Sequence, residues 1–150
     1  MTQTLEPETT TAAPTAQERV DAWLSDERWV PPDHERSNGR MAAEVLAGPA
    51  GAWLYRPPWD DDYEPDRAAA EYDDTIRNLH QDRRPDVVHL GVGGDGHTAS
   101  LFPNTTALDE WNRWMVANWV PSQHEFRITA TFPLLWSARL VLVQAEGEGK

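Results

Sequence analysis

The stretch HLGVGGDGHTASLFP, His89–Pro103, decides the fold class because an apolar run passes directly into four glycines. The run Val87–Leu90 predicts a strand, and the glycines predict a loop at its carboxyl end. Open α/β sheets bind their ligands at the carboxyl ends of strands. Glycines let the backbone approach a ligand closely and leave amide groups free to bind anions. The stretch therefore predicts a site, which is either a dinucleotide cradle or a catalytic loop that uses His97.

Strand-like and helix-like segments alternate on both sides of this loop. One helix is expected at Asn38–Ala47, with Ser37 as its N-cap and a stop at Gly48-Pro49, and a second within Trp59–Gln81. The segment Ser25–Asp33 is predicted to be a polar loop. The other elements are extended segments at Val20–Leu24, Ala52–Tyr55, Trp114–Val120, Arg127–Phe132 and the buried-looking Leu140–Gln144, and a short helix or turn at Pro133–Ala138.

This alternation predicts an α/β fold with a mostly parallel sheet flanked by helices, in a Rossmann-like or doubly wound arrangement. Residues 1–18 are rich in Thr, Pro and Ala and are expected to be a disordered tail. Residues 19–150 are expected to form the α/β domain.

Charge and composition exclude several classes of protein. The net charge of -12 disfavours binding to nucleic acid and to anionic membranes. The chain has no cysteine, so it has no disulfide, no thiolate nucleophile and no thiolate metal site. It carries neither a signal-peptide pattern nor an apolar run long enough to span a membrane, and we expect a cytoplasmic protein.

The glycines match the dinucleotide fingerprint G-x-G-x-x-G by letter, but two features argue against that function. A dinucleotide fold needs a long crossover helix after the glycines, and Pro103 would break it. The fingerprint also belongs to the first βα unit of its domain, whereas two strands and two helices are predicted ahead of Gly91.

The alternative is general-base chemistry. A neutral imidazole, whose ordinary pKa is near 6.5, can take a proton from water, and a neighbouring carboxylate such as Asp95 can fix its tautomer. Against this stands a packing or capping role for His97, which a lone histidine after a glycine turn often has. Ser100 lacks the G-x-S-x-G context of a nucleophile, and the five histidines have no metal-ligand spacing.

The residues of the loop and of several flanking segments resemble the 6-phosphogluconolactonases, within the glucosamine-6-phosphate isomerase/deaminase superfamily. The resemblance covers about Val20 to Lys150 and keeps the family's order and spacing. Its motifs are SDERWVP, SNGRMAAEVL, EPDRAAAEYDDTIR, GVGGDGHTASLFP and FRITATFPLLWSARLVLVQAEGEGK. The D-E-R motif and the G-H-T-A-S-L-F-P ending are typical of the lactonases, whereas deaminases have D-E-Y and G-H-I-A-F-N-E-P.

This resemblance implies hydrolysis of 6-phosphoglucono-1,5-lactone to 6-phosphogluconate in the pentose phosphate pathway, without a metal or organic cofactor. It implies that His97 is the base that activates water and that Asp95 orients it or stabilises its charge. Asp26 would line the same pocket, at the position of the deaminases' catalytic acid. Substrate binding would involve Arg28, Gly93, Gly94, Arg127 and Lys150.

The chain departs from the family at its front and its end. The family has an S-G-G-S-T-P-like loop that holds the substrate phosphate, and nothing here matches it; the family also continues beyond the position of Lys150. Residues 19–150 are therefore expected to be a partial lactonase domain, loosely folded or associated through an uncovered sheet edge. Two other functions stay open: a non-catalytic remnant that binds sugar phosphates or pairs with another subunit, and a glucosamine-6-phosphate deaminase-like isomerase.

Overall fold

The computed structural model describes residues 20–81 and 83–147 of the chain. The tail expected at residues 1–18 and the proposed ligand Lys150 lie outside the described residues. The helical elements are α1 (Asn38–Ala42), the π-helical turn η1 (Ala43–Ala47), α2 (Gly48–Ala50), α3 (Pro65–His80), the 3-10 helix η2 (Thr106–Asp109) and α4 (Phe132–Ser137). The strands are β1 (Asp21–Trp23), β2 (Asp26–Arg28), β3 (Trp53–Tyr55), β4 (Val87–Gly91), β5 (Met115–Val120), β6 (Glu125–Ala130) and β7 (Leu140–Gln144).

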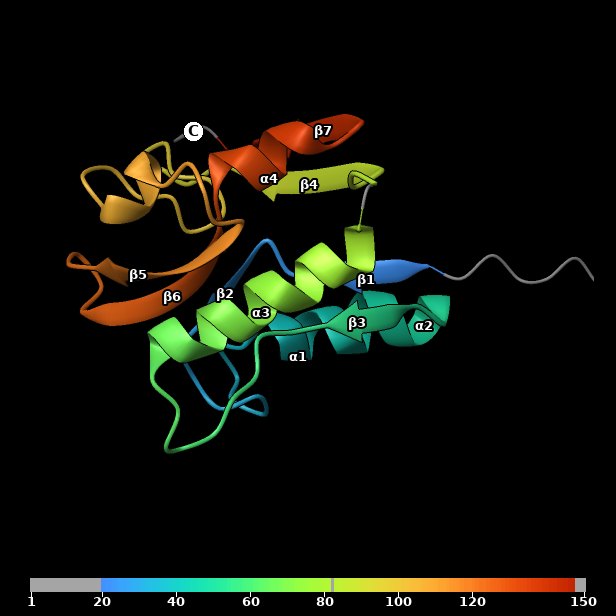
Figure 1. Ribbon diagram of the computed structural model, residues 1–150, viewed down its shortest axis with the longest axis horizontal. Helices are drawn as coiled ribbons and strands as arrows, with labels where there is room; N and C mark the ends of the chain where they lie inside the picture. The colour runs from blue at the N-terminus through green and yellow to red at the C-terminus, as the bar shows by residue number, and fades with distance from the viewer. Residues whose placement is uncertain (1–19, 82, 148–150) are drawn as a thin grey trace, which may run out of the picture.

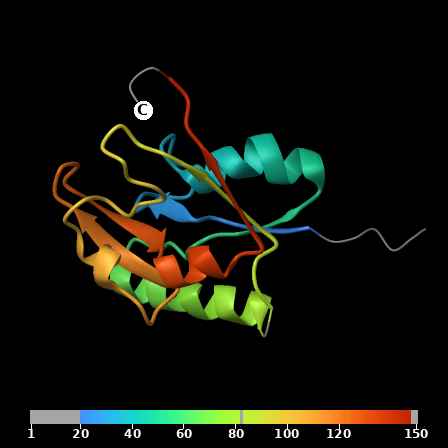
Figure 2. The ribbon, with the colours of Figure 1, turned by 90° about the horizontal axis from the view of Figure 1, so that it is seen from above.

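The strands form three sheets within the described residues (Figure 1). Strands β1 and β3 form a parallel pair, β4 and β7 form a second parallel pair, and β2, β6 and β5 form an antiparallel sheet in that order. Seen from above, helices lie on both sides of the β1–β3 pair, with α1 on one side and α3 on the other (Figure 2). The α/β fold class with parallel pairing and flanking helices is confirmed, and the antiparallel sheet is an addition that the sequence patterns did not indicate.

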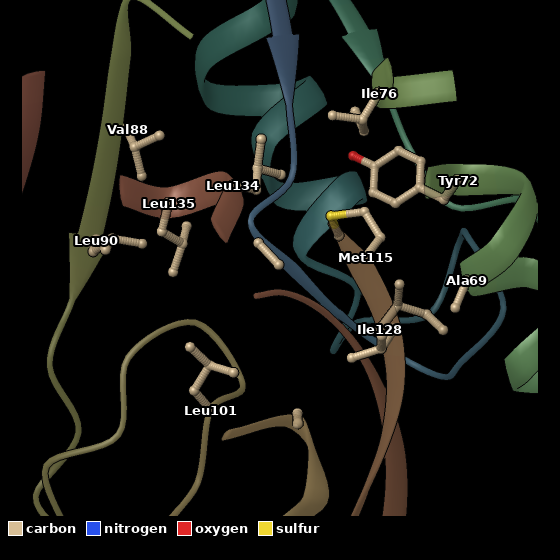
Figure 3. Packing of buried hydrophobic residues seen from close by; sticks show 13 residues of the cluster. Ala69, Tyr72, Ile76, Val88, Leu90, Leu101, Met115, Ile128, Leu134 and Leu135 are labelled. Carbon is tan, nitrogen blue, oxygen red and sulfur yellow. The ribbon is translucent and has the colours of Figure 1, made fainter. Parts of the chain in front are cut away.

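Helix α3 carries the hydrophobic core. Its residues Tyr72 and Ile76 are fully buried against Met115 of β5 and Ile128 of β6. Val88 and Leu90 of β4 belong to the same cluster, together with Leu134 and Leu135 of α4 (Figure 3). One continuous core therefore lies beneath all three sheets.

Two polar side chains of α3 fix this helix to the strands. The Tyr72 hydroxyl accepts a hydrogen bond from the Leu24 amide at 2.9 Å and donates one to the Tyr55 carbonyl at 3.0 Å, and its burial raises the pKa of Tyr72. Asp73 accepts from the amides of Trp114 and Met115 at 2.5 and 2.8 Å. Buried polar groups satisfied in this way set the position of α3 relative to β1, β3 and β5.

Two predicted boundaries are wrong. The segment expected to be a polar loop, Ser25–Asp33, contains β2, which is polar because one face of this strand lines the candidate site rather than the core. The helix expected to stop at Gly48-Pro49 continues to Ala50 and ends at Gly51, whose φ is +64°. The π-helical turn accommodates Pro49: the Gly48 amide donates to the Ala43 carbonyl, and a side chain at Gly48 would press on that carbonyl.

The expectation that Leu140–Gln144 is a buried strand is also wrong. All five residues of β7 are exposed, and among the described strands β7 pairs only with β4. The apolar face predicted for the first helix, formed by Met41, Val45 and Leu46, is exposed as well. The described chain therefore presents apolar surface on β7 and on the first helical segment.

The carboxylate of Glu27 joins β2 to the start of α1. It accepts hydrogen bonds from the Ser37 hydroxyl at 2.9 Å, the Asn38 amide at 2.7 Å and the Gly39 amide at 2.6 Å, and 8 % of the residue is exposed. A negative charge at a helix N-terminus also suits the helix dipole.

We predict that Glu27→Gln lowers the free energy of unfolding by about 2 kcal/mol, because an amide cannot satisfy all of these donors. The control is Glu44→Gln on the same helical segment, which removes an exposed ion pair with Arg40 and should cost about 0.5 kcal/mol or less. Urea unfolding of both variants measures the difference, and equal losses would contradict the proposed role of Glu27.

A second carboxylate makes stability depend on acid pH. Hydrogen bonds from the amides of Asn112 and Arg113 lower the pKa of Glu110 to about 2. Because the folded pKa lies below the ordinary value of 4.5, the stabilisation is complete above about pH 4.5 and disappears as pH falls towards 2.

We therefore expect Glu110→Gln to destabilise the chain by about 1–2 kcal/mol at pH 7 and by much less at pH 3. Thermal unfolding at both pH values, with exposed Asp61→Asn as the control, tests this. A penalty that does not change with pH would show that the charge of Glu110 is not what stabilises the turn.

Candidate active site

The loop after β4 is closed by backbone hydrogen bonds. The Gly93 amide donates to the His97 carbonyl at 2.8 Å, and the Gly96 amide donates to the Gly93 carbonyl at 3.1 Å. Gly96 has φ +83°, a conformation that favours glycine. This closure turns the chain back over the end of β4 and brings His97 next to Gly93.

Asp95 and His97 form a close pair in this loop. The His97 Nδ1 lies 2.5 Å from Asp95 Oδ1, and the same oxygen accepts a hydrogen bond from the His97 amide at 3.2 Å. These hydrogen bonds lower the pKa of Asp95, which keeps its carboxylate ionised. With Nδ1–H donating to Asp95, Nε2 is the nitrogen that can accept a proton, and 27 % of the His97 side chain is exposed.

The imidazole of His97 is held from two sides. Its ring stacks on Phe102 with centroids 4.0 Å apart and planes 22° apart. On Gly93, a Cβ atom would overlap the imidazole, so the close approach requires glycine at this position. Gly94 has open space where its Cβ would lie. The predicted importance of Gly93 thus has a steric explanation, since its own amide is already bonded to His97.

A second group of site residues lies on one face of the β2–β6–β5 sheet. Arg28 is directly opposite Arg127 in the register, and Asp26 is opposite Thr129. Residues opposite one another in an antiparallel pair share a face, and so do residues two apart on one strand. Asp26, Arg28, Arg127 and Thr129 are therefore presented together.

The two arginines differ in their partners. Arg127 has 8 % of its side chain exposed, pairs with Glu125 at 2.6 Å, hydrogen-bonds Gln123 and lies 3.9 Å from Asp26. Arg28 bonds neutral oxygens instead, the Asn38 side chain and the Arg36 carbonyl at 3.3 Å. Among the described residues, Arg28 hydrogen-bonds neutral oxygens and its charge acts on Asp26 only at longer range, so it is the better placed of the two to bind an anion.

Asp26 connects this sheet face to the glycine loop. Its Oδ2 accepts a hydrogen bond from the Ser100 hydroxyl at 2.7 Å, and Asn38 donates to its Oδ1 at 3.3 Å. Burial raises the pKa of Asp26, while Ser100 and the charges of Arg28 and Arg127 oppose that shift. A carboxyl group in this position keeps its proton to a higher pH than an exposed aspartate does.

Ser100 also anchors the segment that follows His97. Its amide donates to the Thr129 hydroxyl at 3.0 Å, and its carbonyl accepts from Asn118 Nδ2 at 2.9 Å. Phe102, two residues later, contacts the His97 ring and lies 5.8 Å from the Arg127 guanidinium carbon. The segment from His97 to Phe102 therefore connects the Asp95–His97 pair to Asp26 and Arg127.

Comparisons with known proteins identify the family of the chain. A family profile described as glucosamine-6-phosphate isomerases/6-phosphogluconolactonase matches residues 1–150. The chain belongs to this family.

Relatives within the family include a 6-phosphogluconolactonase from Chlamydia trachomatis, 38 % identical over 136 residues, and one from Pseudomonas aeruginosa, 37 % identical over 143 residues. Each match covers 88 % of this chain, but only 51 % and 57 % of the relative. The chain thus spans about half the length of the curated relatives it matches.

Solved structures of 6-phosphogluconolactonases are also similar to this chain. A 6-phosphogluconolactonase from Shewanella baltica has a TM-score of 0.77 at 29 % identity, and one from Thermotoga maritima has a TM-score of 0.73 at 29 % identity. The matches cover 87 % and 85 % of this chain and 57 % of each of those chains. The recognised resemblance to the lactonase family is confirmed.

Most of the site residues expected from the sequence lie close to one another: Asp95 and His97 on the loop, with Gly93 and Gly94, and Asp26, Arg28 and Arg127 on the sheet. The connecting residues Ser100, Phe102, Asn118 and Thr129 were missed, because their roles depend on which strands pair. Within residues 20–81 and 83–147, no group of three or more His, Cys, Asp or Glu side chains could hold a metal ion.

We predict that Gly93→Ala displaces the His97 ring from Phe102 and lowers stability by about 1–3 kcal/mol through overpacking. Gly94→Ala is the matched control, since its Cβ meets open space. The NMR shift of His97 Hε1 reports the stacking, because the Phe102 ring current acts on it. An unchanged shift in Gly93→Ala would show that the ring is not held as described.

Proposed function

We propose that this chain carries the catalytic half of a 6-phosphogluconolactonase, with His97 as the base that activates water against 6-phosphoglucono-1,5-lactone. The observation that carries the proposal is the Asp95–His97 pair, whose geometry leaves Nε2 as the proton acceptor at the carboxyl end of β4. The named activity of the Chlamydia and Pseudomonas relatives supports the choice of substrate.

The proposed reaction needs one proton to move twice. Water attacks the lactone carbonyl carbon while His97 Nε2 takes a proton from it, and the ionised Asp95 stabilises the resulting imidazolium. The tetrahedral intermediate then breaks the bond between the carbonyl carbon and the ring oxygen. That oxygen receives the proton from His97, which gives the open-chain acid and restores the base.

Substrate binding is proposed for the cations and amides around this pair. A cation 4 Å from a phosphate charge gains about 1 kcal/mol in water and about 4 kcal/mol in a partly dry pocket. Arg28 supplies such a charge directly, whereas Arg127 has to share its charge with Glu125. Gly94 offers space for the substrate, and Asp26 lines the sugar side. Lys150 keeps its proposed role as a phosphate ligand.

The remaining proposals concern the pathway, the location and the association of the chain. The activity belongs to the pentose phosphate pathway, and we propose a cytoplasmic location and self-association through the unpaired sheet edges. Among the described residues, no helix is both long and apolar enough to cross a membrane. Because the chain spans about half of its relatives, a non-catalytic form that only binds sugar phosphates is the second candidate.

The test follows acid release from freshly prepared lactone, with spontaneous hydrolysis as the background. We expect catalysis above background and a loss of at least about 100-fold in His97→Gln, because general-base catalysis contributes 10²–10⁴-fold. The control is His124→Gln, which changes an exposed histidine in the turn before β6.

Two outcomes would contradict the proposal. Equal rates of lactone hydrolysis in His97→Gln and the unmodified chain would show that His97 is not the general base. A rate no faster than background, combined with calorimetric binding of 6-phosphogluconate, would instead support the binding-only function.

A further inference from the structure

A cavity of about 410 Å³ lies where β2 and β3 end. Its walls come from the chain between residues 27 and 37 on one side and from residues 54–59 on the other. Among the described residues, neither the glycine loop nor β6 lines it, so the cavity is separate from the Asp95–His97 pair. The proposed lactone hydrolysis shares only Arg28 with this lining and leaves the rest of the cavity without a role.

The walls of this cavity are largely flat and apolar. Trp29 and Trp59 both line it and contact each other, with ring centroids 4.3 Å apart and planes 50° apart. Pro57 and Pro58 add rigid apolar surface beside them. Tryptophan rings bind other flat rings by stacking, and this stacking tolerates many ring types. The walls therefore suit a ligand that presents a flat ring.

The charged groups of the lining favour an anion. The guanidinium groups of Arg28 and Arg56 face one carboxylate, that of Glu27. Both oxygens of Glu27 already accept hydrogen bonds, from the Ser37 hydroxyl and from backbone amides at the start of α1. Arg56 is exposed, and among the described residues its guanidinium has no hydrogen-bond or ion-pair partner. The donors of Arg56 are therefore available to a negatively charged ligand.

The hydroxyl groups of the lining argue against a sugar as the ligand. The Ser37 hydroxyl donates to Glu27 at 2.9 Å and accepts from the Arg40 amide at 3.0 Å. The Tyr55 hydroxyl donates to Asp21 at 3.3 Å. Because these hydroxyls are already bonded, a ligand rich in hydroxyl groups would bury several of them without partners, which costs free energy. A ring with few hydroxyl groups avoids this cost.

We propose that this cavity binds a small aromatic anion, a flat ring that stacks on Trp29 or Trp59 and carries a phosphate or carboxylate that binds Arg56. A guanidinium binds either group through two parallel hydrogen bonds. The volume of about 410 Å³ is within the range of small-molecule sites and suits one ring system with its anionic group. Nucleoside monophosphates and aromatic carboxylic acids both have this chemistry.

The experiment titrates the full 150-residue chain with phenyl phosphate and follows the indole N–H resonances of its tryptophans by NMR. We expect the resonances of Trp29 and Trp59 to shift with a Kd of about 1 mM or below, as suits so small a probe. The exposed Trp111 and Trp136, which do not line the cavity, serve as controls within the same molecule.

Three further probes separate the ring from the charge. Phenol has the ring alone, inorganic phosphate has the charge alone, and 6-phosphogluconate has the charge on a chain rich in hydroxyl groups. We expect each to bind at least about fivefold more weakly than phenyl phosphate at the Trp29 and Trp59 resonances, since it lacks either the stacking or the charge-assisted hydrogen bonds. AMP and indole-3-acetate then show which of the two natural sources binds more tightly.

Two variants locate the contacts. Arg56→Gln should weaken phenyl phosphate binding at least about fivefold, because the anionic group loses a charge-assisted partner. Its control, Arg139→Gln, removes the same charge from an exposed arginine paired with Asp86 outside the cavity and should change the Kd by less than about twofold. Trp59→Leu keeps apolar volume but removes a stacking ring, and should weaken binding at least about fivefold. Thermal unfolding shows whether each variant folds, and if Trp59→Leu does not, Arg56→Gln decides.

Three results would overturn the inference. The first is no shift of the Trp29 and Trp59 resonances with phenyl phosphate, and the second is an unchanged Kd in Arg56→Gln. The third is binding of 6-phosphogluconate as tight as that of phenyl phosphate, which would assign the cavity to sugar phosphates. The readout is binding at a cavity apart from His97, so it can succeed or fail independently of lactone hydrolysis.

Discussion

The hydroxyl and backbone of Ser100 hold the candidate site together. Through its contacts with Asp26, Thr129 and Asn118, this residue docks the segment after His97 onto the polar face of the antiparallel sheet. The loop after β4 and the sheet formed by β2, β6 and β5 are far apart in the sequence. These hydrogen bonds keep the imidazole of His97 and the arginines on one surface, where they can contact the same small molecule.

The candidate site also explains how an acidic protein could bind the proposed anionic substrate. The net charge of -12 repels anions at a distance, but salt screens that repulsion beyond about 8–10 Å. Close to the site, Arg28 donates its side-chain hydrogen bonds to neutral oxygens in the described chain, and the charge that it shares with Asp26 is that of a carboxyl group whose pKa burial raises. Glu125, by contrast, holds Arg127 in place and reduces its attraction for a ligand.

Local patterns predicted the helices and most strands well. Alternating or continuous apolar residues identified β1, β3, β4 and β5, and Ser37 correctly marked the start of α1. Strand β2 was missed because its three residues are all charged, and only pairing with β6 makes them extended. The burial of β7 was misjudged for a related reason: an apolar pattern predicts a strand, but it does not say which segments pack against that strand.

In the candidate site, too, the local sequence predicted some features, and others depended on how distant strands pair. Asp95 and His97 are two residues apart, so their pairing could be anticipated from the loop alone. The placement of Arg28 opposite Arg127 depends on the antiparallel register, which no local pattern encodes, and the link from Ser100 to Asp26 spans 74 residues. The resemblance to the lactonases assigned Asp26, Arg28 and Arg127 to one site, but it did not predict the link through Ser100.

The exposed strand β7 has a consequence for solubility. Four of its five residues are apolar and all five are exposed, and an exposed apolar strand can pair with another copy of the chain. At neutral pH the net charge of -12 keeps copies apart, but this repulsion vanishes near the isoelectric point of about 4.7. A mildly acidic buffer would therefore bring the chain to its lowest solubility.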